Sequence, residues 1–219
     1  IQQWDPKVDS ITLNRPEDLV QTFANLNLAD LDEDGDLDIY MGLTNGTIKV
    51  YKNDGNGLFP DDSEDLKDLM GNVIDVGIYA APEFADIDGD GLQDLYIGTH
   101  GQIKKYKNQS LGLFVDDGVM MLGEDTLFTG SYANPAFADL DGDGDLDLYV
   151  AAQPGTITEY INDGGTFTQA GTLQADGEEL DGGSYVMLDF ADMDGDVNID
   201  LYTGAGATAN IRFYKNDGT

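Results

Sequence analysis

The segment ADLDGDGDLDLYVA, residues 138–151, places five aspartates within nine positions and then continues as an apolar run. Closely similar segments begin at Ala29, Ala85 and Ala191. The first aspartates of the four copies are Asp30, Asp86, Asp139 and Asp192, so the steps between copies are 56, 53 and 53 residues. Self-similarity at a nearly fixed period of this length predicts a repeat architecture.

The similarity extends on both sides of these acidic segments and predicts β-structure. An aromatic residue lies seven positions before each first aspartate, at Phe23, Tyr79, Tyr132 and Tyr185. After each segment come an Ile, a Tyr and an Asn in the pattern Ile-x-x-Tyr-x-Asn, as in Ile157, Tyr160 and Asn162. We interpret these recurrent aromatic and Ile/Tyr positions as core between repeats. No segment has sustained helical periodicity, although residues 63–71 could form one helical turn.

Four short strands in a period of about fifty residues indicate a β-propeller blade. We therefore predict an all-β fold, a β-propeller of four four-stranded blades, as a single domain over residues 1–219. The repeats cover approximately 20–75, 76–128, 129–181, and 182–219 plus 1–19. The spacing of Trp4 from Phe23 matches the equivalent spacings in the other repeats, so the N-terminal strand is expected to complete the last blade and close the ring.

The composition excludes several functional classes. The 219 residues include 43 Asp and Glu but only 10 Lys and Arg, a formal net charge of −33. Nucleic-acid binding through a basic face is therefore not expected, because phosphate contacts require clustered cations. The chain has no cysteine and no apolar run long enough to span a membrane, so disulfides, thiolate chemistry and membrane insertion are not expected either. With 41 % apolar residues, the chain can nevertheless form a core.

The acidic segments are the candidate metal sites. Aspartate occupies positions 1, 3, 5 and 9 of all four copies, and closely spaced carboxylates repel one another unless a cation lies among them. Position 7 is variable, so its contribution is expected to be a backbone carbonyl. The predicted ligands are Asp30, Asp32, Asp34, Asp36 and Asp38; Asp86, Asp88, Asp90, Leu92 and Asp94; Asp139, Asp141, Asp143, Asp145 and Asp147; and Asp192, Asp194, Asp196, Asn198 and Asp200. Calcium, about four ions per chain, fits such oxygen-rich cages better than magnesium, and the alternative is that Asp and Gly simply form turns.

Two details refine this prediction. Position 12 of each copy lies in an apolar strand, whereas an EF-hand needs a bidentate Glu there, so these are not EF-hands. Position 6 is glycine in three copies but Val197 in the fourth. If the turn requires a positive φ at this position, valine is costly, and the fourth site is expected to be the weakest.

The pattern FADLDGDGDLDLYV, residues 137–150, followed by GTITEYINDGGTF, residues 155–167, resembles the FG-GAP/VCBS repeat family, whose blades also build the integrin α-subunit propellers. The resemblance covers essentially the whole chain. It implies a β-propeller that holds calcium between the first two strands of each blade, in secreted or cell-surface proteins. On this basis Asp30, Asp32, Asp34 and Asp38 and their equivalents are the ligands. Family propellers usually have seven blades, whereas this sequence predicts four.

Three functional hypotheses remain. The favoured one is a non-enzymatic, calcium-stabilised binding or adhesion module, secreted or displayed on a cell, that recognises a glycan or a surface protein at inter-blade loops. The second is a structural subunit that self-associates through its terminal strands into a filament or multimer. The third, an enzyme acting on polysaccharide, would need an acid/base pair outside the loops; Glu83, Glu159 and Asp189 are unassigned carboxylates, but nothing in the sequence marks them as paired. The lone His100 is interpreted as a loop residue.

Overall fold

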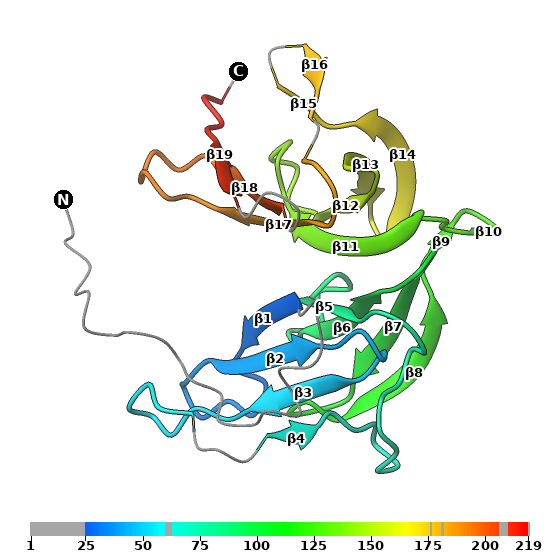
Figure 1. Ribbon diagram of the computed structural model, residues 1–219, viewed down its shortest axis with the longest axis vertical. Coiled ribbons are helices and arrows are strands. Elements are labelled where there is room, and N and C mark those ends of the chain that lie inside the picture. Colours follow the sequence, from blue (N-terminus) through cyan, green and yellow to red (C-terminus); the bar gives the residue numbers. More distant parts are fainter. Residues whose placement is uncertain (1–24, 60–62, 176, 181, 206–209, 219) are drawn as a thin grey trace.

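The computed structural model describes residues 25–59, 63–175, 177–180, 182–205 and 210–218, and all regular secondary structure in these ranges is β-strand. The strands form four blades of a β-propeller (Figure 1), as the repeat pattern predicts. Within the described ranges there is no helix that could span a membrane. The N-terminal strand expected around Trp4 lies outside the described residues.

Each of the first three blades is a four-stranded antiparallel meander. The first blade consists of β1 (Asn25–Ala29), β2 (Asp38–Gly42), β3 (Ile48–Tyr51) and β4 (Glu64–Asp65). The second consists of β5 (Ala81–Ala85), β6 (Asp94–Gly98), β7 (Ile103–Asn108) and β8 (Phe114–Val119). The third consists of β11 (Ser131–Ala138), β12 (Asp147–Gln153), β13 (Thr156–Asp163) and β14 (Thr166–Thr172).

In the described part of the chain, the fourth blade has three strands and the connections between blades add two short hairpins. The fourth blade consists of β17 (Val186–Ala191), β18 (Asp200–Ala205) and β19 (Asn210–Tyr214). The hairpins are β9 (Met121–Leu122) with β10 (Asp125–Thr126), and β15 (Gln174–Ala175) with β16 (Glu178–Glu179).

One local expectation is wrong. Within residues 63–71, where the sequence allows a helical turn, Glu64–Asp65 instead form the outermost strand of the first blade. Asp65 lies opposite Lys49 on β3, and their charged groups form an ion pair of 2.8 Å. Pairing across the sheet therefore decides the local conformation in place of helical propensity.

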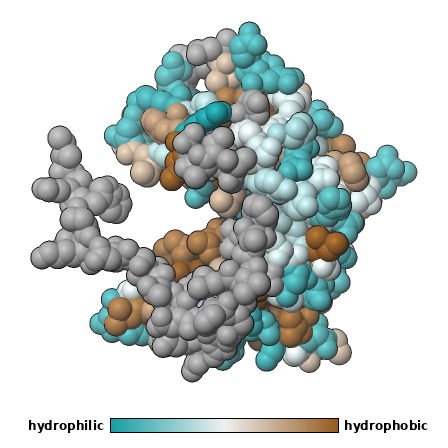
Figure 2. Space-filling view, viewed as in Figure 1, coloured by the Kyte–Doolittle hydropathy of each residue, from teal (hydrophilic) through white to brown (hydrophobic). Residues whose placement is uncertain are grey.

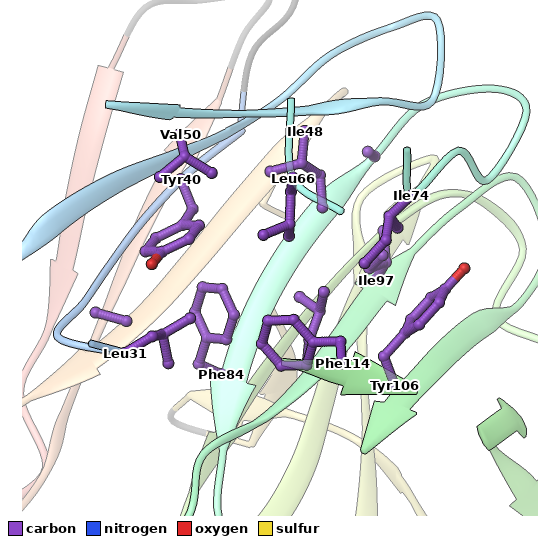
Figure 3. Close-up of a cluster of buried hydrophobic side chains, with 13 residues drawn as sticks. Leu31, Tyr40, Ile48, Val50, Leu66, Ile74, Phe84, Ile97, Tyr106 and Phe114 are labelled. Atoms are coloured by element: carbon purple, nitrogen blue, oxygen red, sulfur yellow. The ribbon is translucent and has the colours of Figure 1, made fainter. Parts of the chain in front are cut away.

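Apolar side chains pack between neighbouring blades, and one aromatic contact recurs at three of these interfaces. A tyrosine on the second strand of one blade lies against a phenylalanine on the innermost strand of the next, with ring centroids 4.8 Å apart in each case. The pairs are Tyr40–Phe84, Tyr96–Phe137 and Tyr149–Phe190. Figure 3 shows the first interface, where Tyr40, Ile48 and Val50 of the first blade face Phe84, Ile97 and Phe114 of the second. The predicted inter-blade core is confirmed at the recurrent isoleucines Ile48, Ile103 and Ile157, each of which is fully buried.

The interface between the fourth and first blades differs from the other three. Tyr202 lies where the recurrent tyrosine is expected, but it packs against Phe213 of its own blade, with ring centroids 5.1 Å apart. Leu28, at the position of the recurrent phenylalanine, is 55 % exposed. Ile211, which the sequence places in the core, is 83 % exposed, so that expectation is wrong for this residue. The described residues therefore leave apolar surface on both sides of this interface.

The innermost strands β1, β5, β11 and β17 line a central cavity of about 700 Å³. Asn134 ties three blades together there: its amide donates to Asn25 Oδ1 at 3.3 Å and its Oδ1 accepts the backbone N–H of Leu188 at 3.0 Å. Figure 2 shows apolar residues in the recess between the half of the molecule containing the first two blades and the half containing the last two. At the start of the innermost strands, Tyr79, Tyr132 and Tyr185 stack edge to face with centroids 5.1 Å apart.

Candidate metal centres

Each acidic segment forms the loop between the innermost strand of a blade and the next strand. The first aspartate accepts two backbone N–H groups from its own loop, and in the third blade Gly142 and Gly144 donate to Asp139 at 2.7 and 3.0 Å. The aspartate at position 5 accepts the N–H two residues on, as Asp143 does from Asp145 at 2.9 Å. These short-range bonds wrap the backbone of the loop around the carboxylates.

A positive φ at position 6 is part of this wrapping, which meets the condition under which the sequence makes valine costly there. The φ values are 93° at Gly35, 89° at Gly91, 98° at Gly144 and 80° at Val197. Valine in this left-handed region is strained, because its branched Cβ crowds the backbone.

The position-9 aspartates begin the second strands and are buried. Asp38, Asp94, Asp147 and Asp200 are between 0 and 7 % exposed. In each blade the Oδ1 atom accepts the backbone N–H of the Asn that ends the Ile-x-x-Tyr-x-Asn pattern, at 2.7 to 2.9 Å. This bond fixes the carboxylate through Oδ1, so its other oxygen, Oδ2, remains for other partners.

Four groups of three aspartates could hold a metal ion, because one carboxylate oxygen of each member lies within 4.8 Å of the others. That separation is about the distance between two oxygens on opposite sides of a calcium ion. The groups are Asp30, Asp32 and Asp34; Asp86, Asp88 and Asp90; Asp139, Asp141 and Asp143; and Asp192, Asp194 and Asp200. No side chain from position 7 belongs to these groups, and the Asp145 carboxylate instead accepts the N–H of Gly164 at 2.9 Å.

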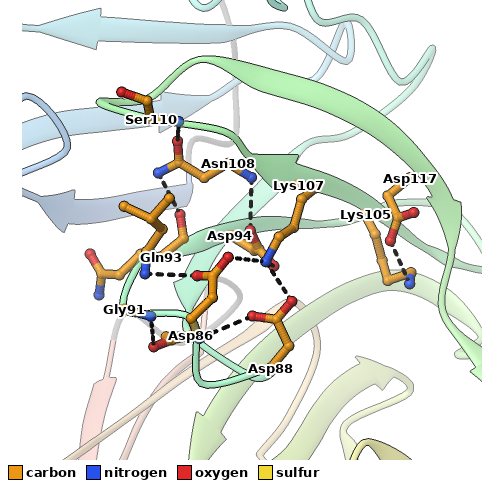
Figure 4. A network of polar contacts seen from close by, with 12 residues as sticks. Asp86, Asp88, Gly91, Gln93, Asp94, Lys105, Lys107, Asn108, Ser110 and Asp117 are labelled. Atoms are coloured by element: carbon orange, nitrogen blue, oxygen red, sulfur yellow. Dashed lines mark hydrogen bonds and ion pairs between the residues drawn. The ribbon is translucent and has the colours of Figure 1, made fainter.

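Lysines that the sequence reasoning passed over contact three of the four loops. Lys107 in the second blade contacts Asp88 at 2.5 Å and Asp94 at 3.4 Å (Figure 4). It also contacts Asp90 at 2.7 Å. Its ammonium lowers the pKa of Asp90. Lys52 and Lys215 contact the first and fourth loops in the same way. The sequence does contain a feature that could have predicted these contacts: the residue between the Tyr and the Asn of the repeated pattern is lysine in these three blades.

The third blade has Ile161 at this position, and there the buried carboxylate of Asp147 has a hydrogen-bond partner for only one of its two oxygens. Asp147 is 0 % exposed, and its Oδ2 atom has no hydrogen-bond partner. Burial, with the negative charges of Asp141 and Asp143, raises the pKa of Asp147 to about 6. A buried unpaired carboxylate oxygen is costly, and a cation among hard oxygen donors would remove that cost. The residues present therefore fit a divalent ion such as calcium.

A groove of about 520 Å³ runs between the second and third blades beside the acidic loops. Its lining combines apolar Met121 and Phe167 with the charged Lys105 and Asp117, whose ion pair measures 2.9 Å. A smaller groove of about 210 Å³, lined in part by Lys67, lies between the first and second blades. Apolar lining with a few polar groups is typical of ligand sites.

Two of the three carboxylates that the sequence left unassigned meet in the central cavity. Glu83 on β5 and Asp189 on β17 both line it, and the side-chain amide of Asn27 donates to Glu83. Burial, together with the negative charge of Asp189, raises the pKa of Glu83 to about 8. Glu159 lies apart and accepts the Tyr149 hydroxyl at 3.2 Å. His100 lies in an exposed turn, and its ring packs against Tyr132 with centroids 5.4 Å apart.

The four blades and their acidic loops define a repeat β-propeller with sites suited to metal. The FG-GAP-like repeat matches residues 30–97, 86–150 and 139–203, and the chain belongs to this family. Comparison with individual curated proteins gives no match.

Two solved structures resemble the fold. A chain of the Photorhabdus luminescens Tc holotoxin pore is 21 % identical with a TM-score of 0.51, and the match covers 96 % of this chain and 9 % of that one. An Agrocybe aegerita lectin that recognises non-reducing terminal N-acetylglucosamine is 22 % identical with a TM-score of 0.49, over 88 % of this chain and 52 % of the lectin. This chain thus spans a small part of the first protein and about half of the second.

Proposed function

We propose that this protein is a non-enzymatic recognition module whose propeller is stabilised by calcium bound in the four acidic loops, and that it acts outside the cell or on its surface. The position-1, position-3, position-5 and position-9 aspartates would hold the ion. When bound, calcium would neutralise carboxylates that otherwise repel one another next to the core. Extracellular calcium modules commonly bind in the range of about 10⁻⁴ to 10⁻³ M, which suits such a setting.

The observation that carries this proposal is the buried Oδ2 of Asp147. Turn formation explains why aspartates accept loop N–H groups, but it does not explain a fully buried carboxylate oxygen without a partner that also experiences the charges of Asp141 and Asp143. A cation ligand role explains both features. The loops of the other three blades also bring together groups of three aspartates that could hold an ion.

For the ligand, we propose the groove between the second and third blades. Lys105 offers donors and Asp117 offers acceptors above an apolar floor, a combination that suits the hydroxyl groups of a glycan or the polar backbone of a protein segment. The loops that would bind calcium border this groove through Asp88 and Asp145. Metal binding would therefore fix the shape of the groove without contacting the ligand.

Binding to a glycan array and to cell-surface protein, in millimolar calcium and after chelation, tests this proposal. We expect binding that requires calcium and that Asp117→Ala weakens at least about tenfold. Lys67→Ala, in the smaller groove, is the matched control and should bind as the unmodified protein does. Metal analysis that finds no bound calcium, together with an unchanged thermal melt, would refute the calcium role. Binding that is insensitive to Asp117→Ala would refute the groove.

A second candidate function, a self-associating structural subunit, is favoured by the apolar surface between the fourth and first blades. Phe213 is 49 % exposed there, and β19 is the outermost strand of its sheet among the described residues. Molar mass in solution tests this candidate. A self-associating protein should dissociate on Phe213→Ser but not on Phe128→Ser, because Phe128 is 78 % exposed elsewhere. A monodisperse 23.6 kDa species would exclude it.

A further inference from the structure

One position outside the acidic loops distinguishes the four candidate metal sites from one another. It lies between the Tyr and the Asn of the repeated pattern, next to the buried position-9 aspartate. The residues there are Lys52, Lys107, Ile161 and Lys215. Three blades thus bring an ammonium group to the loop, and the third brings a hydrocarbon side chain.

The lysines bind the same oxygens that a metal would need. Lys52 Nζ lies 2.7 Å from Asp32 Oδ2 and 2.5 Å from Asp38 Oδ2. Figure 4 shows the corresponding ammonium of Lys107 among the second-blade carboxylates. In the fourth blade, Lys215 contacts both Asp194 and Asp196, the latter at 2.9 Å. Asp196 is the aspartate missing from the fourth oxygen cluster, where Asp200 takes its place.

The third blade provides an independent observation. With Ile161 at the equivalent position, Oδ2 of the fully buried Asp147 has no partner, whereas the corresponding Oδ2 atoms of Asp38 and Asp94 each contact a lysine. The ligand set of the third loop is thus not engaged by a lysine at this position, while those of the other loops are already partly neutralised.

We propose that these lysines are built-in counter-ions that compete with calcium, so that the third-blade site is the tight site and fills first. The inference rests on the proposed calcium binding of the loops. It makes Ile161 the residue that determines affinity and the three lysines the residues that reduce it. The sequence ranked the four sites by calcium affinity from Val197 alone. In the present inference, the lysine has the larger influence on calcium affinity and the strained turn at Val197 the smaller.

The physical reason is the exchange that calcium must make. In the lysine-containing blades, an entering ion displaces an ammonium that holds two or three carboxylate oxygens by charge-assisted bonds, and the displaced charge remains close by and repels the ion. In the third blade, the ion meets oxygens with no lysine to displace. We expect the third site to bind at least about tenfold more tightly than the others.

Equilibrium dialysis of the full chain against calcium, with ions counted at each free concentration, tests this inference. We expect one ion to bind in a first step and the rest at concentrations at least about tenfold higher. Ile161→Lys should remove the first step, and Ile161→Met, which introduces an unbranched side chain like that of lysine but without its charge, should keep it. Lys107→Met should add a second ion to the first step.

The outcomes separate this inference from the proposal on which it rests. Four equivalent ions, or an isotherm that neither Ile161→Lys nor Lys107→Met changes, would overturn the inference while leaving calcium binding intact. No bound ion in millimolar calcium would overturn the proposed function itself. If Ile161→Lys lowers the thermal midpoint in calcium so far that the variant is not folded during dialysis, Lys107→Met alone decides, because it removes a charge from a side chain that is 25 % exposed.

Discussion

The loops of the second and third blades have aspartate at the same four positions, yet they differ in what neutralises them. In the second blade, Lys107 reaches three of the carboxylates, including the position-9 Asp94. In the third, Ile161 contributes no charge and Asp147 keeps an unpartnered buried oxygen. The comparison teaches that the aspartate pattern alone does not define a metal site. The third strand of these two blades also matters, because it carries either a lysine that competes with the metal or an uncharged residue.

Removing calcium should produce the largest change in stability, and it should affect the loops of the second and third blades differently. At calcium concentrations a hundredfold above Kd, each independent site contributes about 2.7 kcal/mol, so chelation should lower the melting temperature by roughly 10 °C or more. Hydrogen exchange should then rise more in residues 139–147 than in residues 86–94, where Lys107 still neutralises the carboxylates. Equal exchange in both loops would contradict the comparison, and an unchanged melt would contradict calcium binding.

The position-9 aspartates provide the next largest effect. Without calcium, Asp147→Asn should stabilise the protein, because it removes a buried charge that has no partner for one of its oxygens. Asp94→Asn should stabilise it less, because Lys107 then loses a partner. In saturating calcium, both variants should be destabilised because each loses a ligand. Urea denaturation with and without chelator measures the four values, and equal changes for both variants without calcium would break the comparison.

The central cavity holds a third kind of carboxylate, the partly buried Glu83, which a proton rather than a metal or a lysine neutralises. The pKa of Glu83 is raised to about 8, above its ordinary value of about 4.5, so the folded protein holds a proton that the unfolded chain releases. Stability should therefore fall as pH rises from about 4.5 to 8 and should level off above that range. Glu83→Gln should flatten this profile and raise the melting temperature at pH 9 by several degrees.

The control for that profile is Glu159→Gln. The Glu159 carboxylate accepts a hydrogen bond from Tyr149 and does not line the central cavity. Thermal melts between pH 4.5 and 9 in a constant calcium concentration measure the difference. If Glu83→Gln leaves the dependence of melting temperature on pH unchanged, then burial and Asp189 do not raise the pKa of Glu83.

The sequence predicted the features that depend on local repetition. The loops, the strands around them and the four blades all follow from patterns that lie within one repeat, since local hydrogen bonds and alternating burial set them.

Features that depend on the ring were missed. Glu83 and Asp189 lie 106 residues apart, and only the closure of blades around a cavity brings both to one surface. Their shared position, three residues before the first aspartate of each repeat, was the available signal. The lysines were missed for a different reason: the repeated pattern was described by its constant residues, whereas the position that distinguishes the sites is variable.

The smallest effect concerns the backbone of the fourth loop. Val197 has a φ of 80°, where Gly144 of the third loop has 98°. Val197→Gly should therefore stabilise the folded state by about 1 kcal/mol, because the left-handed conformation strains a residue with a Cβ, partly offset by the greater freedom of glycine in the unfolded chain. The reciprocal Gly144→Val should destabilise the third loop by a similar amount and weaken its calcium binding. Urea denaturation and calcium dialysis of both variants measure these changes. If exchanging the two residues altered neither quantity, backbone strain would not contribute to the difference between the loops, and the lysine position alone would account for it.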